Sequence, residues 1–208
     1  AMNLIRQIFA AALVLALAMV STAQAKPSDE EIVGRVQSAA DQVLARVTEQ
    51  RAELEAHPER IHDSVVDLIV SYFDFPAMTR SAMGKFWPRA SDPQRAAVVA
   101  EFRELLVRTY GSTVLRYSDK PIEYGKVSWS SDGQRVRVET KVEQQAGQPV
   151  QILYYLHESA GQWLVYDVVV EDLSLVTNYR ASFSNEIRAA GVDGLISKLK
   201  ARNKELGG

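Results

Sequence analysis

Histidines and carboxylates are the residues of this chain whose types could support metal binding or acid–base chemistry. The three histidines, His57, His62 and His157, have no metal-ligand spacing to one another or to a second cluster of ligands. His57 and His62 fall where one helix is expected to end and the next to start, and His157 falls at the end of an expected strand. These positions favour surface or helix-capping roles over a metal site.

Asp167 is the strongest candidate for an acid–base catalyst, because it lies inside an apolar strand. A buried carboxyl with a raised pKa would let an α+β scaffold of this kind work as a proton-transfer enzyme. A structural role is the alternative, since a single acid between Tyr166 and Val168 more often satisfies a backbone amide or an arginine such as Arg180. The sequence favours the structural role, and proton transfer stays open as the second reading.

Other catalytic signatures are missing from the sequence. The chain contains no G-x-S-x-G serine elbow, and no glycine-rich loop opens a helix directly after a strand. We therefore predict no catalytic residue, no metal ligand and no cofactor.

The first 25 residues have the pattern of a secretory signal peptide. Arg6 supplies the positive charge, Ile8–Val20 is an apolar run too short to span a bilayer comfortably, and Ala23-Gln24-Ala25 is a small-x-small cleavage site. A retained membrane anchor is the alternative, which the well-placed cleavage site disfavours. We expect residues 1–25 to be cleaved and residues 26–208 to form a single domain.

Composition then limits the kind of protein. Removing the leader takes away Arg6 and no acid, so 23 basic and 26 acidic residues remain, a formal charge of −3. This balance gives no footprint for nucleic acid. Cysteine is absent, which excludes disulfides and lipid attachment at the cleavage point and fits a bacterial periplasm. No second long apolar run follows the leader, so the mature protein is expected to be soluble.

The first half of the mature chain has helical periodicity. Ser28-x-x-Glu31 is a capping box, and the helix that it opens is expected to end at His57-Pro58. A second helix starts near Ile61, and Asp74 can cap a short third helix that stops at Gly84. A long amphipathic helix follows, capped by Ser91 or Asp92 and ending after Tyr117.

After Pro121 the apolar period changes from about 3.6 to 2, which predicts an antiparallel meander of about four strands. A phase slip at Gly125 indicates a bulge, and Ser131-Asp132-Gly133 is a hairpin turn. The last two strands, Val150–His157 and Trp163–Val170, are apolar on both faces and should be central or covered on both sides. Helices capped by Ser174 and Asp193, and separated by Gly191, end the chain. The predicted fold class is α+β, with a curved antiparallel sheet wrapped by N- and C-terminal helices.

Large apolar side chains are in excess between Phe73 and Trp87, in short or irregular elements. They either plug an ordinary core or line an apolar ligand cavity. Residue patterns alone favour the core, because aromatic and methionine stripes at helical spacing are usually packing.

Several longer stretches are similar to one known family. FDFPAMTRSAMGKFW, a D-P-Q-R helix start, FRELLVRTY, WLVYDVVVEDLSLVTNYRASF and GVDGLISKL resemble the MlaC family, the toluene-tolerance auxiliary component of an ABC transporter. The resemblance covers essentially the whole mature chain in order. One departure is Asp172, which stands where many members have glycine.

The resemblance implies an NTF2-like cone with added helices that encloses an apolar cavity. It implies a monomeric periplasmic carrier of diacyl phospholipid in a Gram-negative bacterium, without a cofactor. Its implied partners are an outer-membrane lipoprotein–porin complex and an inner-membrane ABC transporter with an MCE-domain subunit, and its implied role is to maintain outer-membrane lipid asymmetry. A proton-transfer enzyme acting on an apolar substrate and a periplasmic scaffold without lipid remain alternatives.

The lipid-contacting residues are expected on helix and strand faces around this cavity. The resemblance carries this role onto Leu173. From periodicity, we expect the long helix to form a wall of the cavity and the short segment before it to form one side of the entrance. Inward-facing positions of the strands and of the helix after them are expected to complete the lining. The predicted set is Phe73, Phe75, Met78, Met83, Phe102, Leu106, Tyr110, Val138, Ile152, Tyr154, Val165, Leu173, Val176 and Tyr179.

Overall fold

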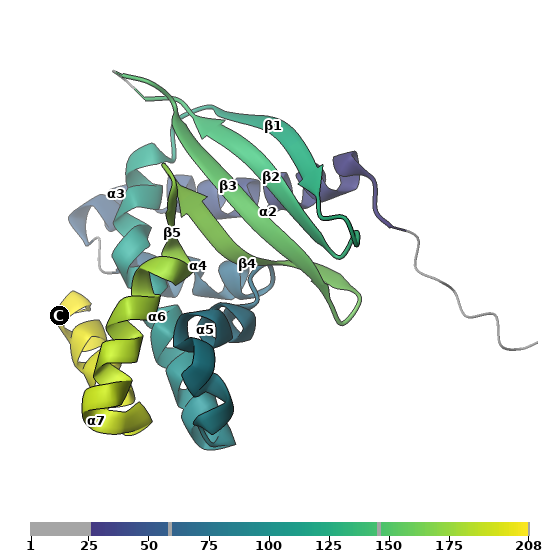
Figure 1. Ribbon diagram of the computed structural model, residues 1–208. Helices are drawn as coiled ribbons and strands as arrows, with labels where there is room; N and C mark the ends of the chain where they lie inside the picture. Colours follow the sequence, from purple (N-terminus) through teal and green to yellow (C-terminus); the bar gives the residue numbers. More distant parts are fainter. Residues whose placement is uncertain (1–25, 58–59, 145–146, 208) are drawn as a thin grey trace, which may run out of the picture.

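The computed structural model describes residues 26–57, 60–144 and 147–207, with backbone only at 61–63, 112, 115 and 117. The predicted leader lies outside the described residues. Six α-helices among these residues and one 3₁₀ segment surround one antiparallel sheet (Figure 1). In chain order the elements are α2 (Asp29–Glu49), α3 (Arg51–Ala56), α4 (Ile61–Val70), α5 (Phe75–Met83), η2 (Gly84–Arg89), α6 (Asp92–Tyr117), β1 (Ile122–Trp129), β2 (Arg135–Val142), β3 (Val150–Ser159), β4 (Gln162–Val170), β5 (Leu173–Ser174) and α7 (Leu175–Leu206).

Local capping residues set most helix boundaries. Ser28 and Glu31 form the predicted reciprocal capping box at the start of α2. The Asp74 carboxylate accepts from the backbone N–H of Ala77 at 2.8 Å, which starts α5. Gly84 has φ +53° where α5 ends, a conformation that glycine adopts without a steric penalty. The first predicted helix differs, because it breaks at Gln50 into α2 and α3.

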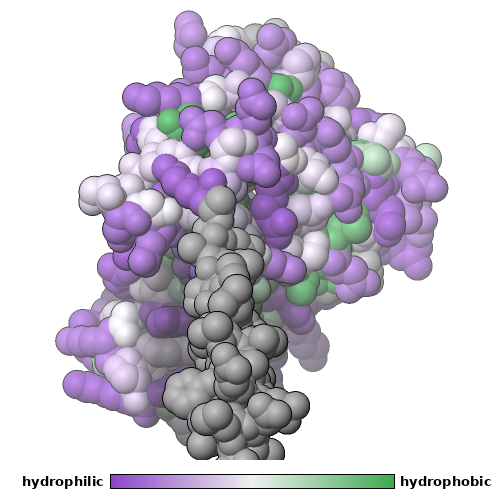
Figure 2. All heavy atoms as spheres, turned by 90° about the vertical axis from the view of Figure 1, so that its right-hand side faces the viewer, coloured by the Kyte–Doolittle hydropathy of each residue, from purple (hydrophilic) through white to green (hydrophobic). Residues whose placement is uncertain are grey.

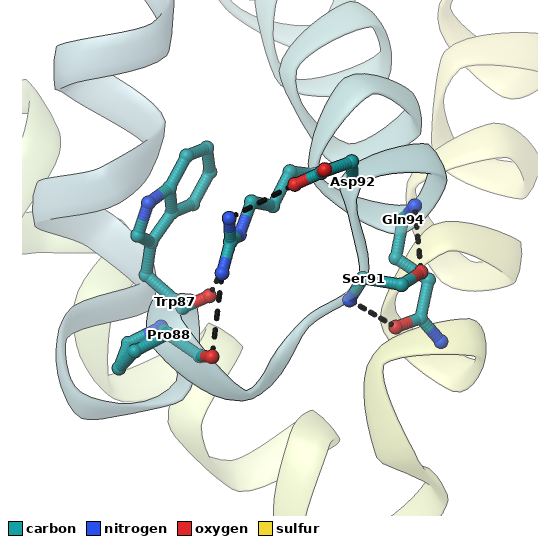
Figure 3. A network of polar contacts seen from close by, with 6 residues as sticks. Trp87, Pro88, Ser91, Asp92 and Gln94 are labelled. Atoms are coloured by element: carbon teal, nitrogen blue, oxygen red, sulfur yellow. Dashed lines mark hydrogen bonds and ion pairs between the residues drawn. The ribbon is translucent and has the colours of Figure 1, made fainter.

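The start of α6 is tied to η2 by a small polar network (Figure 3). Ser91 and Gln94 cap the helix reciprocally, at 3.3 and 3.0 Å. Arg95 donates to the carbonyls of Trp87 and Pro88, and its guanidinium lies 5.4 Å from the centre of the Trp87 indole. These contacts fix the sharp turn between the two elements.

The sheet is a simple meander with the order β1-β2-β3-β4-β5. Its register shifts between Tyr124 and Val127, which confirms the bulge predicted at Gly125. The fifth strand exceeds the predicted four and has only two residues, pairing Val170 with Leu173. Glu171 and Asp172 form the tight turn between them at φ +48° and +67°, a region that favours glycine.

One face of the sheet is buried against α2, which runs along it in Figure 1. Ile32 and Val36 of α2 pack there on Val136, Val138 and other inward residues of the strands. The strands β3 and β4 each have a neighbour on both edges, so they are central in the sheet, as one of the two expectations stated. Their opposite face is only half-buried. The alternation of apolar residues along the strands therefore predicted burial of the inner sheet face better than burial of the outer face.

The largest packed cluster lies away from the sheet, among α5, η2, α6 and α7. Gly191, at φ +73°, breaks α7 where two helices were predicted, and the second part packs on α6. There Asn203 donates from Nδ2 to the Glu101 carbonyl at 2.9 Å. This cluster holds the C-terminal helices and α6 together as one helical layer.

Within the described residues, no helix is both long and apolar enough to cross a membrane. The face shown in Figure 2 is mostly hydrophilic, with apolar residues scattered singly among polar ones. Such isolated apolar residues are normal on a protein surface.

Candidate functional site

An apolar cavity of about 270 Å³ lies between the inner face of the sheet and helices α2, α4 and α6. Its wall takes residues from all of these elements and from the link after α4. The lining residues are Arg35, Val36, Ala39, Ala40, Val43, Leu44, Ile69, Tyr72, Phe73, Thr113, Val114, Ile122, Val142, Val150, Ile152, Tyr154, Leu156, Trp163, Val165 and Val170. Such a wall suits an apolar ligand.

Helix α2 explains why this space stays open. Near its start, Ile32 and Val36 are buried against the sheet, and near its end Val47 is buried in a separate small cluster with α3, α4 and α6. Between these packed ends the helix presents Ala39 and Ala40 to the interior. An alanine side chain stops at Cβ, so it cannot fill the gap between helix and sheet.

The link between α4 and α5 closes the cavity against β4. The Val165 N–H donates to the carbonyl of Tyr72, and the Asp74 N–H donates to the carbonyl of Val165, each at 2.8 Å. This short parallel bridge brings Phe73 to the wall, and the Phe73 ring stacks on Phe75 at 5.9 Å between ring centres. The bridge fixes one side of the cavity through backbone bonds.

Two tyrosines place hydroxyls near this apolar face. Burial raises the pKa of Tyr154, although its hydrogen bond with Thr140 acts in the opposite direction. Burial raises the pKa of Tyr124 to about 12, with smaller effects from Asp41 and Tyr154, and the Tyr124 hydroxyl is buried without a hydrogen-bond partner in the structure. Both phenols therefore stay neutral at neutral pH.

The predicted lipid-contacting residues divide between the cavity and the packed core. Phe73, Ile152, Tyr154 and Val165 line the cavity. The cavity lining does not include the other ten, which are Phe75, Met78, Met83, Phe102, Leu106, Tyr110, Val138, Leu173, Val176 and Tyr179. Eight of these ten take part in the helical-layer cluster, Val138 is buried on the inner sheet face, and Leu173 is 53% exposed. Their contact with a lipid stays a prediction.

The long helix contributes to the cavity at a different place from the one expected. Phe102 packs edge-to-face on Tyr179 and Phe183 of α7, so this stretch of α6 faces the other helices. Thr113 and Val114, near the end of α6, reach the cavity instead. The lining residues of α2 escaped the sequence reasoning, although small residues in the middle of an apolar stripe were a visible signal.

Asp167 has a structural position rather than an open, reactive one. Its carboxylate accepts from the Ser174 hydroxyl at 2.6 Å, and from the N–H groups of Val168 and Val176 at 2.9 and 3.2 Å. Arg180 instead donates to the carbonyl of Ser81. Asp167 thus joins β4 to the first turn of α7, where a carboxylate interacts favourably with the helix N-terminus.

The histidines do not gather into a site. His157 Nε2 lies 2.9 Å from Oδ2 of Asp74, and His57 follows the end of α3. The side chain of His62 lies outside the described part of the chain. Across the described ranges, no group of three or more histidines, cysteines or carboxylates is placed to hold a metal ion.

Comparison with known proteins identifies the family. The sequence profile of the MlaC protein family matches residues 37–201. The chain belongs to the MlaC family.

Individual MlaC relatives match most of the chain. The intermembrane phospholipid transport system binding protein MlaC of Haemophilus influenzae is 21% identical over 79% of this chain and 78% of its own length. The toluene tolerance protein ttg2D of Pseudomonas putida is 23% identical over 76% of this chain and 74% of its own. A phospholipid-binding protein from Ralstonia solanacearum, solved in complex with a phospholipid, superposes with a TM-score of 0.76 at 30% identity, covering 84% of this chain and 98% of that one.

Proposed function

We propose that this MlaC-family protein is a periplasmic carrier of diacyl phospholipids, whose acyl tails occupy the cavity beneath the sheet. The observation that supports this most is the cavity wall, which is apolar at nearly every position that α2, α4 and the strands contribute. The Ralstonia solanacearum relative, described as binding a phospholipid, supports the same ligand class.

The energetics of tail burial suit a carrier. Each buried methylene contributes about 0.8 kcal/mol, so two acyl chains could gain about 20 kcal/mol relative to water, near the ceiling for non-covalent affinity. Release into water would be negligible, whereas exchange with a membrane or another lipid-binding protein is nearly balanced because the tails stay dry. Such a protein needs no catalytic residue, and the engaged carboxylate of Asp167 is in keeping with that.

The proposed route is between the two membranes of a Gram-negative envelope. Residues 1–25 would direct export to the periplasm. There the protein, as a monomer, would exchange lipid with an outer-membrane lipoprotein–porin complex and with an inner-membrane MCE-type ABC transporter, and so maintain outer-membrane lipid asymmetry. The name of the Haemophilus influenzae relative, a binding protein of an intermembrane phospholipid transport system, supports this assignment.

Protein purified from cells without added lipid tests the proposal. Organic extraction or native mass spectrometry should find diacyl phospholipid bound to the full mature chain. Protein that is lipid-free, and that takes up no lipid from vesicles, would overturn it. Partner binding without lipid would favour the scaffold reading, and an Asp167→Asn variant that loses a turnover while keeping its lipid would favour the enzyme.

A further inference from the structure

Arg35 is the one charged side chain among the described residues that line the cavity. It lies in the second turn of α2 and is half-buried, so it stands where the apolar wall meets solvent. The lining residues nearest to it along the helix are Val36 and Ala39. A guanidinium in this setting needs an explanation, because arginines are usually fully solvated or paired with an acid.

The Arg35 side chain is held in place by β4 and by the link after α4. Its Nε donates to the carbonyl of Trp163, and its guanidinium carbon lies 5.6 Å from the centre of the Tyr72 ring. The Tyr72 hydroxyl is itself fixed, since it accepts from Gln42 Nε2 at 2.5 Å and lies 3.3 Å from the Ser38 hydroxyl. Arg35 is therefore oriented by two elements outside its own helix before any ligand arrives.

The two terminal nitrogens of Arg35 remain available. Within the described residues, neither Nη1 nor Nη2 makes a hydrogen bond or an ion pair. The acids close to it in the fold have other partners. Glu31, one turn earlier on α2, accepts from the N–H of Ser28, and Asp74 binds the N–H of Ala77 and His157. Among the described residues, no carboxylate lies within ion-pair distance of the Arg35 guanidinium.

We propose that Arg35 binds the phosphate of the cargo phospholipid through Nη1 and Nη2. The planar fork of a guanidinium matches two phosphate oxygens, and Nε is already used to aim it. This inference rests on the proposed function and adds a residue that selects phosphate-bearing lipids over neutral ones. It also orients the cargo, with its headgroup at Arg35 and Trp163 and its tails directed toward Val142, because Val142 and Trp163 pair with opposite ends of β3.

The test compares two water-soluble short-chain lipids with identical tails, a diacyl phosphatidylglycerol and the corresponding diacylglycerol, on delipidated protein by calorimetry. The wild type should bind the phospholipid about 10- to 100-fold more tightly, the range expected for a charge-assisted pair. Arg35→Met should weaken phospholipid binding much more than diacylglycerol binding and so remove this preference, and Arg35→Lys should retain part of it. Arg46→Met is the matched control, because Arg46 lies on the same helix, donates to the carbonyl of Ser64 and is outside the cavity lining.

Each result decides one part of the proposal. Equal binding of both lipids by the wild type, or an unchanged preference in Arg35→Met, overturns the role of Arg35 and leaves the carrier function standing. Failure of the wild type to bind either lipid overturns the carrier function itself. Free glycerol phosphate that binds as tightly as the phospholipid would make Arg35 a site for soluble phosphates and overturn the lipid assignment. Should Arg35→Met fail to fold, the wild-type preference and the Arg35→Lys variant still decide the matter.

Discussion

Filling the cavity from α2 is the most direct test of its role. Ala40 lies in the lining, midway between the two packed ends of the helix. Ala40→Phe would place a phenyl ring in space that is otherwise open to the ligand. If the ring excludes about four methylenes of an acyl chain, at about 0.8 kcal/mol each, the loss is about 3 kcal/mol, or about 100-fold in affinity.

The empty protein should tolerate this change. Burying the ring contributes about 1.5 to 3 kcal/mol, which offsets the lower helix propensity of phenylalanine, about 0.5 kcal/mol relative to alanine, and the ordering of its side chain. The delipidated variant should therefore be as stable as the wild type, or about 1 kcal/mol more stable. Loss of ligand without loss of fold separates cavity filling from general damage.

The assay measures lipid content after purification and uptake from vesicles, together with urea denaturation of the delipidated protein. Ala45→Phe serves as the control, because Ala45 is on the same helix but exposed to solvent. It should keep normal lipid content and lose only about 0.5 kcal/mol from reduced helix propensity. If Ala40→Phe carries as much lipid as the wild type at unchanged stability, the cavity is not where the tails reside.

Three further predictions concern the scaffold. Asp167→Ala removes the acceptor of three hydrogen bonds at the junction of β4 and α7, and should lower the free energy of unfolding in urea by about 2 to 4 kcal/mol while leaving lipid content unchanged. Arg95→Ala removes the hydrogen bonds between α6 and η2 and should lower the free energy of unfolding by about 1 to 2 kcal/mol in the same measurement. Burial, reinforced by Tyr179, raises the pKa of Tyr110 to about 12. An unfolded tyrosine ionises near pH 10, so the folded state holds the extra proton between these values and stability should fall as pH rises from about 10 to 12. In Tyr110→Phe the urea midpoints should fall less steeply over that range.

Clear outcomes would contradict these expectations. Wild-type stability in Asp167→Ala or in Arg95→Ala would mean that the corresponding hydrogen bonds contribute nothing net. Tyr124 has a similarly raised pKa, so Tyr110→Phe should reduce the alkaline slope rather than abolish it. A slope equal to that of the wild type would show that Tyr110 ionises in the fold as easily as in the unfolded chain.

Local features of the fold were predictable because they depend on neighbouring residues. The Ser28–Glu31 box and the Asp74 cap are patterns of four residues whose hydrogen bonds form within one turn. The bulge at Gly125 follows from a change of phase within one strand. The hydrophobic alternation of β2 likewise identified the buried face of the sheet, with Val136 and Val138 inward.

The composition of the cavity wall depended on distant contacts. Periodicity showed that Phe102 and Leu106 lie on a buried stripe, but not that α7 would return to cover that stripe. Leu173 was assigned by family resemblance, and it is 53% exposed because it directly follows the tight turn at Glu171 and Asp172. The cavity itself arises where the small side chains of Ala39 and Ala40 leave space between helix and sheet unfilled. Two alanines within an apolar stripe are only a weak sequence signal for such a space.

The separation between the helical-layer cluster and the cavity has an evolutionary consequence. The residues that contribute most to the largest core, such as Phe102 and Phe183, do not line the cavity. Substitutions that widen, narrow or reshape the cavity therefore need not erode that core. Lineages with this architecture can change the cargo they hold through a few positions on α2 and β3, without first acquiring a reserve of stability.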